Sequence, residues 1–278
     1  MTHPVSSTSG APAVYLREGE LWLPTDHSRG PWDPRAQHGG APCALLAHVA
    51  ETAAPGRGWR LARLTVELIK PVPVSPLRTQ CSTQAARSTA RVGIDMVAGD
   101  ALVARAHALL MRIDPLKLPA DLPIGWSPAQ LERLPAQCSE PVRIPGLPEG
   151  VSFYRTAMET RVAQGDTTRP GPAGAWFRPI MPLVQGAPTS PAMRAAAAAD
   201  FGNGLAWVLP VSRFLFSNAD ISIHLYREPV GEWIGLLSES QVHGDGGGIV
   251  NSYLYDERGA IGMAVQTLVL RERAQAAA

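Results

Sequence analysis

The sequence lacks any uninterrupted apolar run of the roughly 18–20 residues that a membrane-spanning helix needs. Residues 1–7 have no cationic segment followed by an apolar one, so we expect no secretory signal. Cysteine is also scarce: the 3 cysteines, Cys43, Cys81 and Cys138, show no metal-ligand spacing. These absences predict a cytoplasmic protein with reduced thiols, no bound metal and no cofactor.

The sequence has almost no excess charge of either sign. Lys and Arg number 25 against 24 Asp and Glu, which gives a formal net charge of +1, and no basic stripe is present. This argues against a nucleic-acid or membrane-surface partner. There is no Gly-x-Ser-x-Gly motif either, which disfavours a serine hydrolase with that nucleophile.

Proline, by contrast, is concentrated between residues 115 and 150. Because proline removes a backbone donor and fixes φ, neither a long helix nor a central strand can run through this stretch. The 278 residues are enough for one large domain or two ordinary ones. We therefore predict an N-terminal repeat at 13–114, a Pro-rich linker at 115–150 and a C-terminal repeat at 151–273.

Each predicted repeat contains an alanine-rich helix. In the first, Gly39-Gly40-Ala41-Pro42 begins a run that ends near Thr52. In the second, Ser190 is a favourable N-cap, Pro191 suits the first helical position, and Gly202 suits a left-handed C-terminal residue. We expect both helices to lie close to a sheet, because their side chains are small.

Alternating strands follow each helix at similar distances along the chain. Residues 63–71 and 220–227 carry apolar side chains at every second position, which is typical of half-buried strands. They align with Arg63 opposite Asp220, an offset of 220 − 63 = 157. The closing strands align with His107 opposite Gln266, an offset of 266 − 107 = 159. Near-equal offsets favour an internal repeat.

Several segments resemble the double hot-dog acyl-CoA thioesterases. They are Gly30-Pro31-Trp32-Asp33, Gln37-His38-Gly39-Gly40, Ala199-Asp200-Phe201-Gly202-Asn203-Gly204, the strand that begins at Asp220, residues 232–240, and Val265-Gln266. The resemblance implies an α+β double hot-dog fold, in which each repeat has a long central helix wrapped by a curved antiparallel sheet. It also implies acyl-CoA hydrolysis and self-assembly into a homo-oligomer.

The family's active site is similar to an Asp, a Thr or Ser, and a Gln that together hold the attacking water. Carried over to this sequence, the Asp falls on Asp220 and the Gln on Gln266, while the hydroxyl position falls on Gln241. Gln241 departs from the family, although an amide can also hold a water. Since Arg63 cannot act as a base near neutral pH, we expect the chemistry in the second repeat.

Thioester hydrolysis needs a base for the water and donors for the carbonyl oxygen, and a positioned base contributes roughly 10²–10⁴ in rate. Asp220 is the predicted base, with Gln241 and Gln266 orienting the water. His38, Gly39 and Gly40 are the predicted substrate-binding residues, because free N–H groups at a helix N-terminus can hold the carbonyl oxygen. His38 alone would be interpreted as a packing or capping residue.

Three alternatives remain open. Asp220 could be an ordinary solvent-facing strand residue. The chain could be a hot-dog enoyl-CoA hydratase, since such enzymes use an Asp–His pair and Asp220 and His224 share one strand face. It could also be a non-catalytic acyl-CoA or lipid-binding protein, which the unusual Gln241 would suit.

Overall fold

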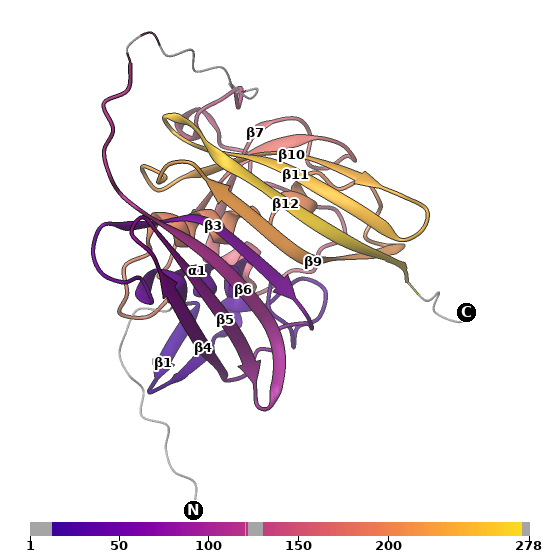
Figure 1. Cartoon of the computed structure of the whole chain (residues 1–278). Coiled ribbons are helices and arrows are strands. Elements are labelled where there is room, and N and C mark those ends of the chain that lie inside the picture. Colours follow the sequence, from indigo (N-terminus) through magenta and orange to yellow (C-terminus); the bar gives the residue numbers. More distant parts are fainter. Residues whose placement is uncertain (1–12, 120, 122–129, 274–278) are drawn as a thin grey trace, which may run out of the picture.

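The computed structural model describes residues 13–119, 121 and 130–273. Twelve strands form one antiparallel sheet (Figure 1). The first six are β1 (Tyr15–Glu18), β2 (Leu21–Pro24), β3 (Trp59–Leu68), β4 (Leu77–Ala85), β5 (Thr89–Ala98) and β6 (Ala101–Arg112). The others are β7 (Met158–Gln164), β8 (Ala173–Pro179), β9 (Phe214–Leu225), β10 (Ile234–Val242), β11 (Gly247–Asp256) and β12 (Gly259–Glu272).

The helical elements are short. They are η1 (Asp26–Ser28), α1 (Gly40–Thr52), η2 (Pro135–Gln137), η3 (Phe153–Ala157), α2 (Pro191–Ala199) and α3 (Gly202–Leu205). The predicted long central helices are not confirmed, because α1 has 13 residues and α2 only 9. Gly202 does not end α2 in a left-handed conformation. It begins α3, and a Cβ there would lie 2.5 Å from Ser252 Oγ.

The strand order shows the internal repeat. The order β1-β2-β4-β5-β6-β3 in one half recurs as β7-β8-β10-β11-β12-β9 in the other, and β3 pairs with β9 where the halves meet. At that seam Arg63 pairs with His224 and Glu67 with Asp220, so a local two-fold axis passes by Thr65 and Ser222. This register confirms the alignment of Arg63 with Asp220.

The second predicted alignment is wrong by one residue. Ile221 pairs with Gln266, and its counterpart at 221 − 157 = 64 is Leu64, which pairs with Ala108. The residue equivalent to Gln266 is therefore Ala108 and not His107. A one-residue shift moves a side chain to the other face of a sheet, and indeed Ala108 is buried while His107 is exposed.

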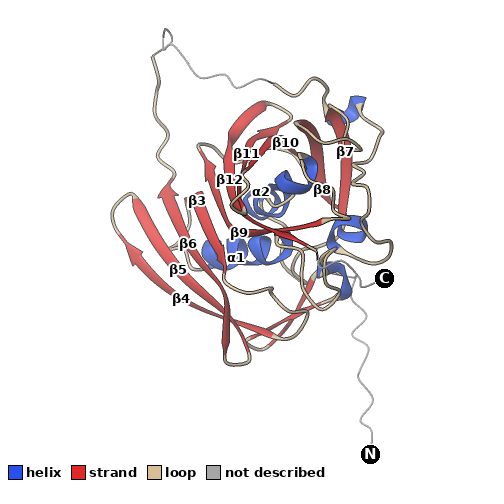
Figure 2. Ribbon diagram, turned by 90° about the vertical axis from the view of Figure 1, so that its right-hand side faces the viewer, coloured by secondary structure: helices blue, strands red, loops and turns tan. Residues whose placement is uncertain are grey.

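The hydrophobic core lies between the helices and the concave face of the sheet. Figure 2 shows α2 enclosed by the curved strands of the second half, while α1 lies against those of the first. Both helices are almost wholly buried, and they pack against each other because alanine side chains permit close approach. Within the described residues, no helix combines the length and the apolar composition that crossing a membrane requires.

Residues 131–138 of the Pro-rich linker pack on the outer face of the second half, whereas Val142 joins the main core and Ile144 packs against Gly204 of α3. Leu131 lies over Gly174 and Gly235, where a Cβ on either glycine would collide with it. Trp176 Nε1 donates to the Arg133 carbonyl at 2.8 Å. The linker therefore covers apolar surface as well as connecting the repeats. The predicted boundaries at 114 and 150 stay predictions.

The two helices run antiparallel and contact each other at both ends. Where α1 ends and α2 begins, Ser190 Oγ donates to Glu51 Oε2 at 2.6 Å. Burial raises the pKa of Glu51; the Ser190 hydroxyl lowers it, nearby Glu228 raises it, and Arg194 lowers it. The net upward shift means that folding favours the neutral acid, so stability falls as pH rises from the ordinary glutamate range through the raised pKa.

We expect Glu51→Gln to stabilise the protein at pH 7, because the amide keeps an acceptor for Ser190 without a buried charge. Urea unfolding of both proteins at pH 7 and at pH 4 checks this. The variant should have the higher midpoint at pH 7, and the difference should shrink at pH 4, where Glu51 is protonated in the wild type. A lower midpoint for the variant at pH 7 would contradict this.

Candidate active site

The opposite end of the helix pair places a carboxylate against a helix N-terminus. Asp200, which directly follows α2, accepts a hydrogen bond on Oδ2 from the Gly40 backbone N–H at 2.7 Å. Gly40 is the first residue of α1, whose N-terminus carries a partial positive charge from the helix dipole. An acid is disfavoured at its own helix's C-terminus, and here the other repeat supplies the compensating charge.

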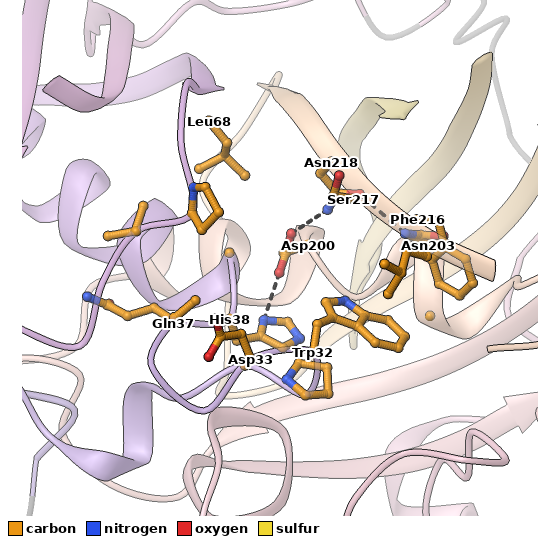
Figure 3. A pocket seen from close by; sticks show the side chains of 18 of the residues that line it. Trp32, Asp33, Gln37, His38, Leu68, Asp200, Asn203, Phe216, Ser217 and Asn218 are labelled. Atoms are coloured by element: carbon orange, nitrogen blue, oxygen red, sulfur yellow. Dashed lines mark hydrogen bonds and ion pairs between the residues drawn. The ribbon is translucent and has the colours of Figure 1, made fainter. Parts of the chain in front are cut away.

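Two further side chains hold Asp200. His38 Nδ1 lies 2.7 Å from Oδ2, and Asn218 Nδ2 donates to Oδ1 at 2.6 Å (Figure 3). Burial alone would raise the pKa of Asp200, but the charge and hydrogen bond of His38 and the donors of Asn218 and Gly40 outweigh it and lower the pKa. Asp200 is therefore held as an ionised, buried carboxylate, with its side chain 5% exposed.

His38 is held with its ring in a fixed orientation. It packs against Phe201 and Phe153, with ring centroids at 4.6 and 5.4 Å. The 2.7 Å contact with the carboxylate of Asp200 requires a proton on Nδ1, so Nδ1 does not accept from the Gly40 N–H 3.2 Å away. Nε2 has no hydrogen-bond partner among the described residues. The side chain is 12% exposed and lines a cavity, so Nε2 can reach a ligand there.

The cavity lies between the two repeats and has a volume of about 690 Å³. Its polar part includes His38, Gly39, Asp200 and Asn218. Its apolar part draws on both repeats and on the linker. These residues are Trp32, Pro42, Leu68, Ile69, Val72, Ile144, Leu147, Tyr154, Phe201, Leu215, Phe216 and Val269. Such a pocket suits an apolar ligand that carries one reactive polar group.

Gly39 makes room for this arrangement. A Cβ at Gly39 would lie 2.6 Å from Asp200 Oδ1, and one at Gly40 would lie 2.6 Å from the Ala197 carbonyl. The two glycines therefore permit close contact between the start of α1 and the end of α2. The Gly40 N–H is already bonded to Asp200, whereas the Gly39 N–H has no partner among the described residues and Gly39 lines the cavity.

The structure does not bring Asp220, Gln241 and Gln266 together. Asp220 is paired with Thr267 and accepts a hydrogen bond from its backbone N–H at 2.9 Å, on the outer face of the sheet. Gln266 is paired with the buried Ile221 on the inner face. Gln241 is exposed on β10. Side chains on opposite faces cannot hold one water, so the expected convergence is not found.

Gln266 nevertheless contacts the end of α2. Its Nε2 donates to the Ala199 carbonyl at 2.7 Å, directly before Asp200, while its buried Oε1 has no partner among the described residues. It does not line the cavity. Gln266 thus satisfies a terminal carbonyl of α2 and fixes the point at which Asp200 leaves the helix.

The first repeat lacks the same polar set. By the seam alignment, the counterpart of Asn218 is Leu61 (218 − 157 = 61), and that of Gln266 is Ala108; both are buried and apolar. The inward-facing amides of Asn218 and Gln266 therefore have no polar counterpart in the first repeat. Among the described residues no three His, Cys, Asp or Glu side chains cluster as metal ligands.

Sequence reasoning missed Asp200 and Asn218 as site residues. The signal for Asp200 was present: an acidic residue directly after an alanine-rich helix opposes that helix's dipole and needs a compensating partner. Asn218 gave no signal, because a bulge beside Ala219 changes the face on which the residues before it lie.

Comparison with known proteins supports this fold and class. Residues 28–111 match the acyl-CoA thioesterase N-terminal domain and residues 131–270 match the acyl-CoA thioesterase C-terminal domain. The fold and the matched domains define a double hot-dog protein of the thioesterase class. The chain belongs to the acyl-CoA thioesterase family.

Solved structures agree with the fold. A candidate thioesterase from Novosphingobium aromaticivorans is 20% identical, with a TM-score of 0.71 over 94% of this chain and 100% of that one. An acyl-CoA thioesterase II from Mycobacterium marinum is 13% identical, with a TM-score of 0.62 over 94% and 95% of the two chains. A hot-dog protein from Alicyclobacillus acidocaldarius is 14% identical, with a TM-score of 0.65 over 94% and 96%. Among curated proteins, no sequence matches this chain.

Proposed function

We propose that this protein hydrolyses acyl-CoA thioesters in the cavity between its repeats, giving the free acid and CoA. One observation carries the proposal. The buried Asp200 of the second repeat holds His38 and the helix N-terminus of the first, within a largely apolar cavity of about 690 Å³. Family membership supports the reaction class.

His38 and Asp200 are the proposed proton-moving pair. The ionised Asp200 accepts the Nδ1–H of His38 at 2.7 Å, so Nε2 is the acceptor whenever the ring is neutral. A water beside Nε2 loses a proton to it as its oxygen attacks the thioester carbonyl, and Asp200 stabilises the imidazolium that forms. The imidazolium then returns the proton to the departing CoA sulfur. In this proposal His38 and Asp200, and not Asp220, take the proton of the attacking water.

The start of α1 supplies the proposed site for the negative charge on the carbonyl oxygen. The Gly39 N–H, which has no partner in the part of the chain that the structure describes, is a donor on the cavity wall, and the positive end of the helix dipole lies behind it. Losing one such donor typically costs about 10²–10³ in turnover. Gln266 acts as a positioning residue, since it holds the Ala199 carbonyl and thereby the place of Asp200.

The same pair also suits a second reaction. A hydratase of this fold uses an Asp–His pair to add water across the double bond of an enoyl-CoA, and His38 with Asp200 is such a pair, whereas Asp220 with His224 lies on the outer face. The two reactions differ in the atom attacked: the thioester carbonyl carbon for hydrolysis, the β-carbon for hydration.

Two assays on one substrate panel distinguish these functions. We expect thiol release from both saturated and unsaturated acyl-CoAs. With the unsaturated substrates, the enoyl absorbance should not fall faster than thiol is released. Enoyl hydration without thiol release would establish the hydratase instead. Saturable binding of acyl-CoAs without either reaction would leave a binding protein and would overturn the proposal. The panel also gives the preferred acyl chain length.

A further inference from the structure

Two cationic side chains that line the cavity have no ion-pair partner within residues 13–119, 121 and 130–273. Lys70 follows β3 in the first repeat, Arg271 lies on β12 in the second, and both line the cavity and are exposed. Neither side chain has a hydrogen bond or an ion pair with any described residue. By contrast, the exposed Arg213 forms an ion pair with Glu272 at 3.1 Å.

The acidic groups of the cavity do not offset these two charges. Asp33 also lines the cavity, but Arg35 holds both of its oxygens, at 3.1 and 3.0 Å. Asp200 is buried and bonded to His38, Gly40 and Asn218. The exposed part of the cavity wall therefore carries uncompensated positive charge, although the whole chain has a formal net charge of only +1.

We propose that Lys70 and Arg271 bind a phosphate group of the thiol carrier, so that the site selects phosphate-bearing thioesters over uncharged ones. This inference rests on the proposed function. If the thioester carbonyl lies at the buried His38, the pantetheine arm must lead outward past the apolar wall, and the phosphates emerge where the cations are exposed. Charge-assisted bonds from Lys and Arg are the usual means of holding phosphate.

The test compares three thioesters of the same acid: those of CoA, of 4′-phosphopantetheine and of pantetheine, which has no phosphate. The variant is Lys70→Gln/Arg271→Gln. Its matched control is Arg78→Gln/Arg91→Gln, which removes two exposed charges from β4 and β5, away from the cavity. We expect the first variant to raise KM for acyl-CoA roughly 10-fold, with little change in kcat or in KM for the pantetheine thioester. The control should match the wild type.

The phosphopantetheine substrate locates the contact. A KM increase equal to that with CoA places the cations on the pantetheine phosphate, and an increase with CoA alone places them on the nucleotide phosphates. Both results support the inference. An equal increase for the pantetheine thioester, or no increase for acyl-CoA, would overturn it. Calorimetric binding of CoA itself to both variants keeps this test separate from the proposed function, because it needs no hydrolysis.

Discussion

Asp200→Asn should lower kcat for thioester hydrolysis by roughly 10²–10⁴, with a much smaller change in KM. The amide has no charge to stabilise an imidazolium on His38. In the wild type, Gly40 and His38 donate to one carboxylate oxygen and Asn218 donates to the other. In the variant one of these oxygens becomes an NH₂ group, which cannot accept from those donors. Steady-state kinetics with the preferred acyl-CoA, followed by thiol release, measures the effect.

Asp220→Asn is the matched control for this prediction. The substitution is chemically identical, and the amide oxygen can still accept the Thr267 N–H on the outer face of the sheet. We expect its activity to be within about two-fold of the wild type. If Asp220→Asn abolished turnover and Asp200→Asn did not, the sequence-based assignment would be right and the one from geometry wrong.

Acid unfolding separates the charge of Asp200 from its packing. A carboxyl whose pKa is lowered by folding contributes stability above its unfolded pKa, near 3.9, and that stability is lost as pH falls through the folded pKa. The wild type should therefore lose stability in this window more steeply than Asp200→Asn. Comparing the two proteins at neutral pH also shows whether the variant is folded when its activity is measured.

Much of the fold could be predicted from the sequence because its signals are local. The alternation in residues 63–71 and 220–227 and the helix-start signals at Pro42 and at Ser190-Pro191 depend on neighbours in the chain, and these elements are present. The seam alignment of Arg63 with Asp220 was predictable for the same reason. The lengths of the helices could not be predicted in this way. Helix α2 ends at Ala199, whose carbonyl accepts a hydrogen bond from Gln266, 67 residues later in the chain.

The site could be predicted only in part, because its geometry depends on which face each side chain occupies. His38, Gly39 and Gly40 were predicted as substrate-binding residues at a helix start, and the structure places all three against Asp200 of the second repeat. The choice of Asp220 over Asp200 depended on strand alternation, which a bulge beside Ala219 interrupts. A bulge leaves no reliable trace in a single sequence, so Asn218 could not have been assigned to the inner face.

Gly39→Ala should remove most of the activity while leaving the fold largely intact. The added Cβ would lie 2.6 Å from Asp200 Oδ1 and 3.0 Å from Cγ and Oδ2, closer than real Cβ contacts allow. The carboxylate must therefore move, and it cannot do so without breaking its bonds to Gly40, His38 or Asn218. We expect kcat to fall by roughly 10²-fold or more, because a misplacement of about 1 Å can cost that much.

Two other glycine substitutions serve as controls for Gly39→Ala. Gly40→Ala drives its Cβ against the Ala197 backbone carbonyl, which cannot rotate away, so it should lower the melting temperature as well as the activity. Gly93→Ala on β5 meets only Ser82 Oγ at an ordinary 3.4 Å and should change neither. A Gly39→Ala protein that melts like the wild type but does not turn over substrate would tie catalysis to the position of Asp200. Normal turnover in that protein would mean that Asp200 can shift freely, and that its contacts with the first repeat serve folding alone.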